Sequence, residues 1–475
     1  MNVPPEVSRR TFLFMALVCA GVVLDTTERS LGAAELMVDN VTGLYGVAVA
    51  RIVRPVTTQE VANAIASWPG SVAIGGGRFS MGGQVAVSGG LHLDMRDMKR
   101  LVWFRPEQRC VRVQAGMRWR DLQDIIDPHE LSVTTMQSFA NFTAGGSVSV
   151  NAHGRYVGNG PIGHSVRALQ LVLADGSIVE ADRRQHAQLF RAAIGGYGAI
   201  GVITEIELDL TDNVRIERLV STMALEAYPA HFEASVRGDP ATIFHNADLV
   251  PPLYDQPIAV TWRRTDKTLT ETARLILRAR SYPIEHSLIW ALTELPLADH
   301  LQAPVVRPLM LAQPMVTWRN HEASRDVAQL EPMTRKIATY VLQEYFIPVA
   351  QFAGFARKMA SVLLRNKVVA LNISIRHSPA DTVSLLPWAP TEVFSFVLYY
   401  KQRSNRHATD QVGRWTRDLI DIALAHGGRY YLPYQLHATQ VQFDRAYPEA
   451  AHLRTLKRQV DPGGKFSNQM WRKYL

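Results

Sequence analysis

The clearest candidate for chemistry in this sequence is a glycine-rich run at residues 75–83. It comprises Gly75, Gly76, Gly77, Arg78, Phe79, Ser80, Met81, Gly82 and Gly83, between two strand-like segments at 72–74 and 91–93. Because glycine adopts positive φ angles and has no side chain to shield the backbone, the N–H groups of such a run can converge on an anion. A pyrophosphate suits this arrangement, although a plain glycine turn has the same composition.

Two further segments rich in small residues follow, at 143–163 and 196–201. With the run at 75–83 as the first glycine segment, these are the second and the third. The third contains Gly196, Gly198 and Gly201 in a G-x-G-x-x-G pattern. That pattern binds a dinucleotide when a strand precedes it and a helix follows, because the helix N-terminus holds the pyrophosphate. Here a helix-like stretch at 188–194 precedes it and an alternating strand at 202–208 follows. We therefore exclude a Rossmann domain.

Composition excludes several other classes. The 475 residues are enough for two domains that share a cleft, and 47% apolar with 20% charged residues is typical of a globular protein. The net charge is +8, but lysines and arginines are scattered and no nucleic-acid module is present, so we expect no nucleic-acid partner. The sequence contains neither a metal-ligand spacing nor a serine-nucleophile elbow, so we expect no metal site and no hydrolase activity.

The N-terminus has the pattern of an export signal. Paired arginines in Ser8-Arg9-Arg10-Thr11-Phe12-Leu13 precede a short apolar stretch at 12–24 and small residues at 32–34. This pattern predicts a twin-arginine signal peptide over residues 1–34, with the twin-arginine export machinery as a partner and a periplasmic or cell-envelope location. The apolar stretch is shorter than the ~20 residues that span a bilayer. An uncleaved N-terminal membrane anchor is the alternative.

The middle of the chain predicts a second domain. Strand-like runs occur at 258–262, 339–349, 368–375 and 393–400, with helical stretches at 267–281, 352–365 and 410–426. These elements predict an antiparallel sheet flanked by helices and hence an α+β protein. Side chains on alternate positions of such strands would line one wall of the cleft.

The three glycine segments, with the tail 461–471, resemble the vanillyl-alcohol oxidase/para-cresol methylhydroxylase (PCMH-type) FAD-binding superfamily. Within it, the sequence is most similar to sugar-lactone and alditol oxidases and to decaprenylphosphoryl-ribose oxidases. The resemblance implies a two-subdomain PCMH-type FAD-binding domain at 35–211, a substrate-binding cap at 212–427, and a C-terminal segment at 428–475 that returns to the FAD domain. It also implies FAD as cofactor.

Residues from all three segments and the tail are implied as FAD-binding. They are Gly75, Gly76, Gly77, Arg78, Phe79, Ser80, Met81, Gly145, Gly146, Ser147, Asn151, His153, Gly154, Gly198, Ile203 and Asn468. Many relatives attach the flavin covalently through a histidine at the position of Arg78. Arginine cannot form that bond, so we expect dissociable FAD, with Arg78 pairing to a phosphate. His153 leaves a second covalent route open.

Candidate catalytic residues come from the cap and the segment that follows it. Gln343 and Tyr345 share one face of a strand that is similar to the Gln-x-Gln-x-x-x-Pro strand of the decaprenyl enzymes. Ser374 and Arg376 lie in a segment that resembles the Glu-Ile-Arg strand of the alditol oxidases, with serine in place of glutamate. Tyr434 and His437 fall where those oxidases have histidine and lysine. A different register places Tyr434 at the active-site lysine of the decaprenyl enzymes.

The implied activity is oxidation of a CH–OH donor, such as a sugar or polyol, by hydride transfer to flavin N5 and loss of the hydroxyl proton. We expect His437 to act as base, Tyr434 to relay a proton and Arg376 to stabilise negative charge, while Gln343 orients a hydroxyl. Relatives with glycine at the position of Ala152 are oxidases and one with alanine is a dehydrogenase, which favours a quinone or redox carrier over O2 as acceptor. The alternatives are a flavin-carrying subunit of a larger redox complex and a non-enzymatic periplasmic binding protein.

Overall fold

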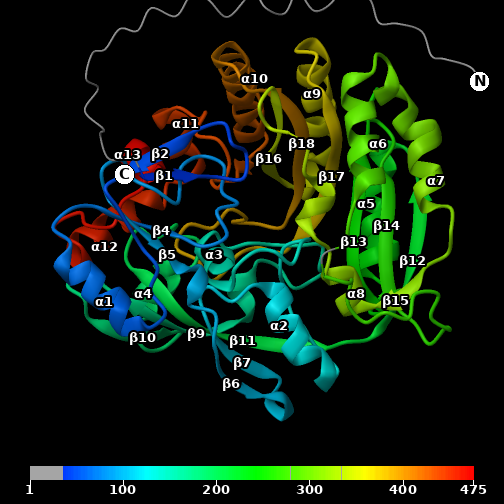
Figure 1. Ribbon diagram of the computed structural model, residues 1–475. Coiled ribbons are helices and arrows are strands. Elements are labelled where there is room, and N and C mark those ends of the chain that lie inside the picture. Colours follow the sequence, from blue (N-terminus) through cyan, green and yellow to red (C-terminus); the bar gives the residue numbers. More distant parts are fainter. Residues whose placement is uncertain (1–35, 279, 333) are drawn as a thin grey trace, which may run out of the picture. The chain divides into compact units, whose positions relative to one another are not determined.

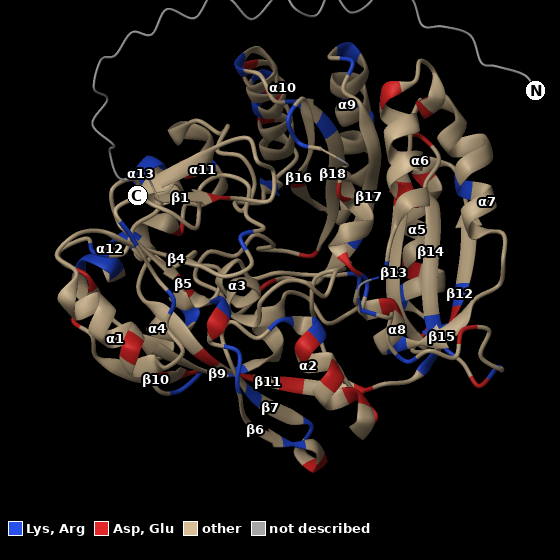
Figure 2. Ribbon diagram, viewed as in Figure 1, with Lys and Arg blue, Asp and Glu red and all other residues tan. Residues whose placement is uncertain are grey.

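The computed structural model describes residues 36–278, 280–332 and 334–475. The predicted export signal at 1–34 lies outside these residues. Among the helices in the described ranges, none combines the length and the apolar character needed to cross a bilayer. Acidic and basic side chains are interspersed along the ribbon, as the scattered charges of the sequence predict (Figure 2).

The first part of the chain begins with an antiparallel pair, β1 (Leu36–Asp39) and β2 (Gly46–Val49), and continues into two larger sheets joined by helices (Figure 1). The smaller is parallel, in the order β3-β5-β4, and helix α1 (Thr58–Ser67) connects β3 to β4. Its strands are β3 (Arg51–Val53), β4 (Val72–Gly75) and β5 (Leu91–Asp94). The larger is antiparallel, in the order β10-β9-β11-β7-β6, with β8 (Leu131–Val133) also pairing β11. Its other strands are β6 (Leu101–Arg105), β7 (Cys110–Gln114), β9 (Val166–Val172), β10 (Ile178–Asp182) and β11 (Val202–Asp212).

The three glycine segments occupy the connections of these sheets. The first leaves the end of β4, and the second contains the short helix α3 (Ala144–Ser149). The third lies between helix α4 (Ala187–Ala193) and strand β11, so a helix precedes it and a strand follows it. The order expected from the sequence is confirmed, and a Rossmann βα turn is absent at this point of the described chain.

The second part of the chain forms an eight-stranded sheet, the cap sheet, with strand order β15-β12-β14-β13-β17-β18-β16-β19. All its neighbouring strands run antiparallel. The strands are β12 (Arg215–Thr222), β13 (Thr242–Leu249), β14 (Ile258–Arg264), β15 (Val316–Trp318), β16 (Ala338–Pro348), β17 (Ala370–Ser378), β18 (Val393–Arg403) and β19 (Arg429–Tyr430). The four strands expected here are confirmed, and the fold is α+β.

Helices cover one face of the cap sheet and border it on the other. Helices α9 (Phe352–Arg365) and α10 (Arg406–Ala425) lie side by side over β16 and β18 (Figure 1). Both were expected. The helix expected at 267–281 is wrong, because the chain there is irregular and α6 (Pro283–Glu294) begins only after it. Helices α7 (Arg307–Leu311) and α8 (Arg319–Ala323) complete this region.

The C-terminal segment packs against the first part of the chain. It contains helices α11 (Gln440–Ala446), α12 (Ala450–Val460) and α13 (Gln469–Tyr474). The N–H of Val72 donates to the carbonyl of Lys465, and the N–H of Ser467 donates to the carbonyl of Val72. The tail thus extends along β4, directly before the first glycine segment.

Candidate active site

A cavity of about 530 Å³ lies between the three glycine segments and the face of the cap sheet opposite to α9 and α10, with α6 beside it. From the glycine segments it is lined by Gly76, Gly77, Arg78, Phe79, Ser80, Met81, Gly145, Gly146, Ser147, His153, Gly198 and Ile203. From the cap sheet it is lined by Asn246, Asp248, Tyr340, Leu342, Glu344, Leu371, Asn372, Ser374, Arg376, Val397 and Tyr399. Tyr431 and Tyr434 contribute from the chain after β19.

The first glycine segment fits the pyrophosphate of FAD. Within the described chain, the five successive backbone N–H groups of residues 76–80 donate to no protein acceptor, and all five residues line the cavity. A Cβ atom on Gly76 would lie 2.3 Å from the hydroxyl of Thr143, so a side chain would collide with the second glycine segment. Free N–H groups on a bare loop form an anion-binding nest.

The guanidinium of Arg78 is held by protein groups. Its Nη2 donates to Oδ2 of Asp94 and lies 3.1 Å from Nε2 of His92, while the backbone adopts a φ of 60°. Burial opposes the charge of Asp94, but a hydrogen bond from Arg96 and the charge of Arg78 outweigh it and hold the pKa of Asp94 below its ordinary value. The structure therefore pairs Arg78 with Asp94, where a phosphate partner was expected.

Four of the residues expected at the cofactor lie behind the cavity wall. Gly75 ends β4, and a Cβ there would lie 2.5 Å from the ring of His92. Asn151 donates to Asp381 and accepts from the N–H of Gly163, and Asn468 caps α13 and donates to the carbonyl of Tyr197. Gly154 packs against the carbonyl of Met136. These residues hold the glycine segments in place and do not line the cavity.

A cluster of polar side chains around Glu344 of β16 contacts the second glycine segment through His153. Oε1 of Glu344 lies 2.5 Å from Nε2 of His153, and its Oε2 accepts a hydrogen bond of 3.2 Å from the hydroxyl of Tyr434. Burial would raise the pKa of Glu344, but the contact with His153, the charge of Arg376 and the bond from Tyr434 hold it below its ordinary value. Burial and the neighbouring carboxylate raise the pKa of Tyr434. The site thus holds a buried carboxylate that stays ionised at neutral pH.

Arg376 supplies a positive charge on the same sheet face. Among the described residues, no carboxylate lies within ion-pair distance of its guanidinium, and its Nε has no hydrogen-bond partner. It neighbours Ser374 on β17, and both Arg376 and Tyr434, two of the expected catalytic residues, line the cavity. An unpaired guanidinium in a cavity can stabilise negative charge on a bound oxygen.

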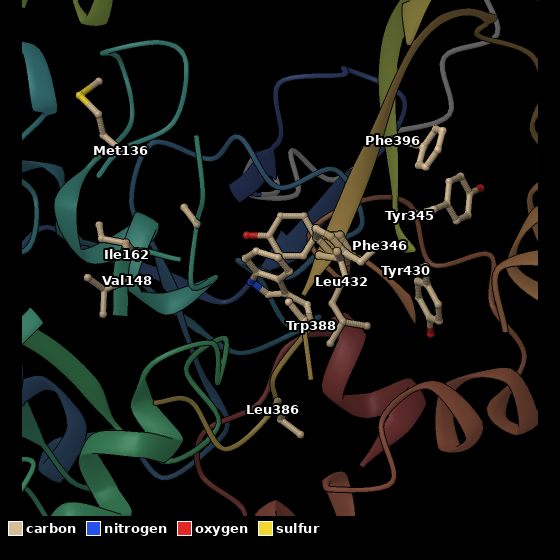
Figure 3. Close-up of a cluster of buried hydrophobic side chains, with 14 of the residues drawn as sticks. Met136, Val148, Ile162, Tyr345, Phe346, Leu386, Trp388, Phe396, Tyr430 and Leu432 are labelled. Carbon is tan, nitrogen blue, oxygen red and sulfur yellow. The ribbon is translucent and has the colours of Figure 1, made fainter. Parts of the chain in front are cut away.

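The expectations for Gln343 and Tyr345 are wrong, because these residues lie on the opposite face of β16. Gln343 donates to the hydroxyls of Tyr400 and Thr416, and Tyr345 donates to Oε1 of Gln343. Figure 3 shows Tyr345 beside Phe396, apart from the stacked pair Phe346 and Trp388. This face packs against α9 and α10, and strand alternation turns Glu344 toward the cavity instead.

His437 is also displaced from the site that was expected for a base. It lies against α10, where a Cβ on Gly413 would approach its ring to 3.1 Å, and it does not line the cavity. Burial, with the charges of Lys473 and Arg417, lowers the pKa of His437 to about 4. This side chain is neutral at neutral pH, but it has no access to a donor.

Glu344 is a cavity-lining candidate for a functional residue that the sequence analysis missed. In the cap sheet, Glu344 on β16 and Ser374 on β17 are both paired with Val397 of β18, so they lie in one row across three strands. A carboxylate thus lies in the same row as Ser374, the position at which the alditol oxidases were expected to carry glutamate. The signal was the single carboxylate in an otherwise uncharged strand, on the face opposite to Gln343 and Tyr345.

Comparisons with known proteins match the parts of the chain that enclose the cavity. Residues 49–182 match the family "FAD binding domain", and residues 258–474 match the family "D-arabinono-1,4-lactone oxidase". The chain is 25% identical to the alditol oxidase of Streptomyces sp. over 437 residues, which cover 89% of this chain and 95% of that protein. It is 22% identical to the L-gulonolactone oxidase of Bos taurus, over 89% of this chain and 94% of that protein.

The chain also matches the decaprenylphosphoryl-beta-D-ribose oxidase of Mycolicibacterium smegmatis over a shorter stretch, with 31% identity over 144 residues. This match covers 30% of this chain and 31% of that protein. The two family matches divide between the glycine segments and the cap sheet with its C-terminal continuation, the parts that enclose the cavity. The chain belongs to the PCMH-type FAD-binding flavoprotein superfamily, and it is an FAD-dependent oxidoreductase that acts on CH–OH donors.

Proposed function

We propose that this protein oxidises a hydroxyl-bearing donor of the sugar or polyol class, with Glu344 as the group that accepts the hydroxyl proton. The observation that carries the proposal is the buried, ionised carboxylate of Glu344 on the cavity face, fixed by His153 and Tyr434. Alditol and L-gulonolactone oxidases are among the relatives that match over most of the chain.

The roles of the protein groups follow from charge and position. FAD, when bound, supplies the hydride acceptor that turns the CH–OH carbon into a carbonyl. Glu344 takes the proton from the donor oxygen, which balances the hydride that leaves the carbon. Arg376 stabilises the negative charge that grows on that oxygen as the proton departs. Tyr434 donates to Oε2 of Glu344 and keeps the carboxylate oriented toward the cavity.

Anaerobic reduction of the bound flavin tests this proposal. The purified protein is mixed with alditols, aldoses and aldonolactones in the absence of O2, and the flavin absorbance is followed. Bleaching by one of these donors, with formation of the matching carbonyl product, is the expected result. A flavin that stays oxidised with every donor would remove the proposed substrate class.

We also propose that the FAD is held without a covalent bond. Arg78 stands where many relatives carry the linking histidine, and Nε2 of His153 is already engaged by Glu344. Acid precipitation should release the yellow colour into the supernatant. Flavin that stays with the precipitated protein, seen as fluorescence of the protein band after denaturing electrophoresis, would contradict a dissociable cofactor.

The electron acceptor that we propose is a quinone or a redox carrier. Ala152 supports this, because its methyl group lines the cavity beside His153, where relatives that use O2 have glycine. The donor loses two electrons and two protons in all, counting those of the hydride; the electrons would then leave on the reduced carrier, and the protons on the quinol or in solvent. Replacement of Ala152 by glycine tests this proposal, because it removes the methyl group without changing the charge of the site.

We propose export by the twin-arginine route, on the basis of the Arg9-Arg10 pair before the apolar stretch. The matched variants are Arg9→Lys with Arg10→Lys, which keep the charge but break the arginine pair. Cell fractionation should place the unaltered protein in the periplasm or envelope and the double variant in the cytoplasm. Equal distribution of the two proteins would argue against this route.

A further inference from the structure

One wall of the cavity is apolar, although the sugar and polyol donors expected here are rich in hydroxyls. The helices that bound this wall also place Glu285, Gln302 and Arg307 at the cavity. Seven residues that line it also form a contiguous apolar cluster, which we call the apolar chamber. They are Leu288, Ile289, Leu292, Val306, Tyr340, Leu371 and Tyr399. The chamber is bounded on one side by α6 and the π-helix before α7 (Gln302–Val306), and on the other by strands β16, β17 and β18.

The two tyrosines of the chamber add no free hydroxyl groups. The hydroxyl of Tyr340 forms a hydrogen bond of 2.8 Å with Thr293, and that of Tyr399 donates to the carbonyl of Leu330. Both hydroxyls are satisfied by protein groups, so the rings offer mainly carbon to the cavity. A sugar bound against this wall would lose water from its hydroxyls without replacement partners, which costs free energy.

A β-bulge builds the chamber into the cap sheet. The register of β17 against β18 shifts between Ala370 and Asn372, so Leu371 is the extra residue. Strand alternation would turn Leu371 away from the face that carries Asn372, Ser374 and Arg376. The bulge lets both Leu371 and Asn372 line the cavity, as bulges beside active sites do when they redirect a side chain.

The chamber lies at a defined distance from the proton acceptor. Tyr340 and Glu344 are four residues apart on the same face of β16, which places their backbones roughly 13 Å apart at the usual rise of a strand. A donor whose hydroxyl lies at Glu344 would therefore extend its distal part into the chamber.

We propose that the natural donor is an amphiphile, an alcohol whose distal part is an alkyl or similarly apolar chain held in the apolar chamber. This inference rests on the proposed function, because it assigns the substrate class of the same site. The oxidised hydroxyl lies at the polar end, near Glu344 and Arg376, and the apolar chain replaces water along α6 and the bulge of β17. Burial of apolar groups is the source of the affinity.

The test measures how affinity depends on chain length. Alkyl glycosides and 1-O-alkyl glycerols of increasing chain length, kept below their micelle concentrations, are titrated calorimetrically into the FAD-loaded protein. We expect affinity to rise about three- to fourfold for each methylene until the chamber is full. Affinity that does not change with chain length would overturn the proposal.

Three variants locate the effect. Leu292→Gln places a polar group in the chamber, so affinity should depend less on chain length. Ile289→Trp should fold and fill part of the chamber, so affinity should level off at a shorter chain. Leu309→Gln is the matched control, because Leu309 lies in α7, is 71% exposed and does not line the cavity. A loss in Leu309→Gln equal to that in Leu292→Gln, or an unchanged series in Ile289→Trp, would contradict the chamber assignment.

Flavin reduction measured on the same series separates this inference from the proposed function. Bleaching by short polar donors with affinity independent of chain length would leave the oxidoreductase proposal standing and remove the apolar donor. Affinity that depends on chain length, without bleaching by any donor, would support the chamber and contradict the proposed substrate chemistry.

Discussion

His153 of the second glycine segment and Glu344 of the cap sheet meet at 2.5 Å, and both side chains are almost completely buried. This contact joins the flavin-binding part of the chain to the part that forms the donor site. Removing the charge of Glu344 should therefore affect proton transfer first and the fold second.

Glu344→Gln should lower kcat/KM for the donor by about 10²–10⁴-fold while FAD remains bound, because an amide cannot accept the hydroxyl proton. In the wild type, kcat/KM should begin to fall with decreasing pH only below the ordinary pKa of a carboxyl group, because the pKa of Glu344 is lowered. Steady-state kinetics from pH 4 to 8, with flavin content measured by absorbance, check both. Tyr345→Phe is the matched control on the other face of β16 and should leave kcat/KM unchanged; unaltered turnover in Glu344→Gln would exclude the residue as base.

Arg376→Ala should slow flavin reduction by the donor and leave FAD bound, because the guanidinium lines the cavity without an ion-pair partner of its own. We expect a loss on the order of 10²-fold, comparable to removal of one group that stabilises a developing oxyanion. Stopped-flow absorbance under anaerobic conditions measures this step directly. Arg376→Lys should recover part of the rate, and unaltered reduction in the alanine variant would place Arg376 outside the mechanism.

The sequence predicted the fold well and the catalytic side chains only in part, for a physical reason. Glycine segments and strand periodicity are local signals, so the flavin-binding loops and the strands of the cap sheet could be predicted. The face that a strand turns toward a cavity depends on what packs against its other face. Helix α10 contacts Gln343 through Thr416, which places Glu344 in the cavity, and no local pattern contains that contact.

A similar limit applies to the irregular segment before α6 and to the bulge at Leu371. Residues 267–281 have helical composition, but ion pairs made by Arg274 with Asp127 and by Arg278 with Asp124 hold the chain against the first part of the protein. The bulge is visible only in the pairing of β17 with β18. Both features depend on contacts between residues far apart in the sequence.

His437→Gln should make the fold less sensitive to acid without changing catalysis at neutral pH. The pKa of His437 is lowered to about 4 by burial, below its ordinary value of 6.5, so the unfolded chain binds the proton first as pH falls. Above pH 6.5 this histidine does not lower the free energy of unfolding. As the pH falls from about 6.5 to 4, protonation of the unfolded chain lowers that free energy progressively. Urea unfolding at pH 7 and pH 5 should show a wild-type loss from this site on the order of 1 kcal/mol that the variant lacks. A large fall in kcat/KM at neutral pH in the variant would instead return His437 to the catalytic machinery.

Ala152→Gly should raise the rate at which the reduced enzyme reacts with O2. The Ala152 methyl lines the cavity next to His153 and is buried, so its removal opens space at the flavin side of the site without changing charge. Peroxide release, measured after anaerobic reduction and mixing with aerated buffer, should increase at least tenfold, whereas reduction by the donor should be unchanged. Ser149→Ala, a substitution at another cavity-lining position of the same segment, is the control and should leave O2 reactivity as it is. Rapid peroxide release by the unaltered protein would show that the Ala152 methyl does not exclude O2, and the acceptor would then be O2 itself.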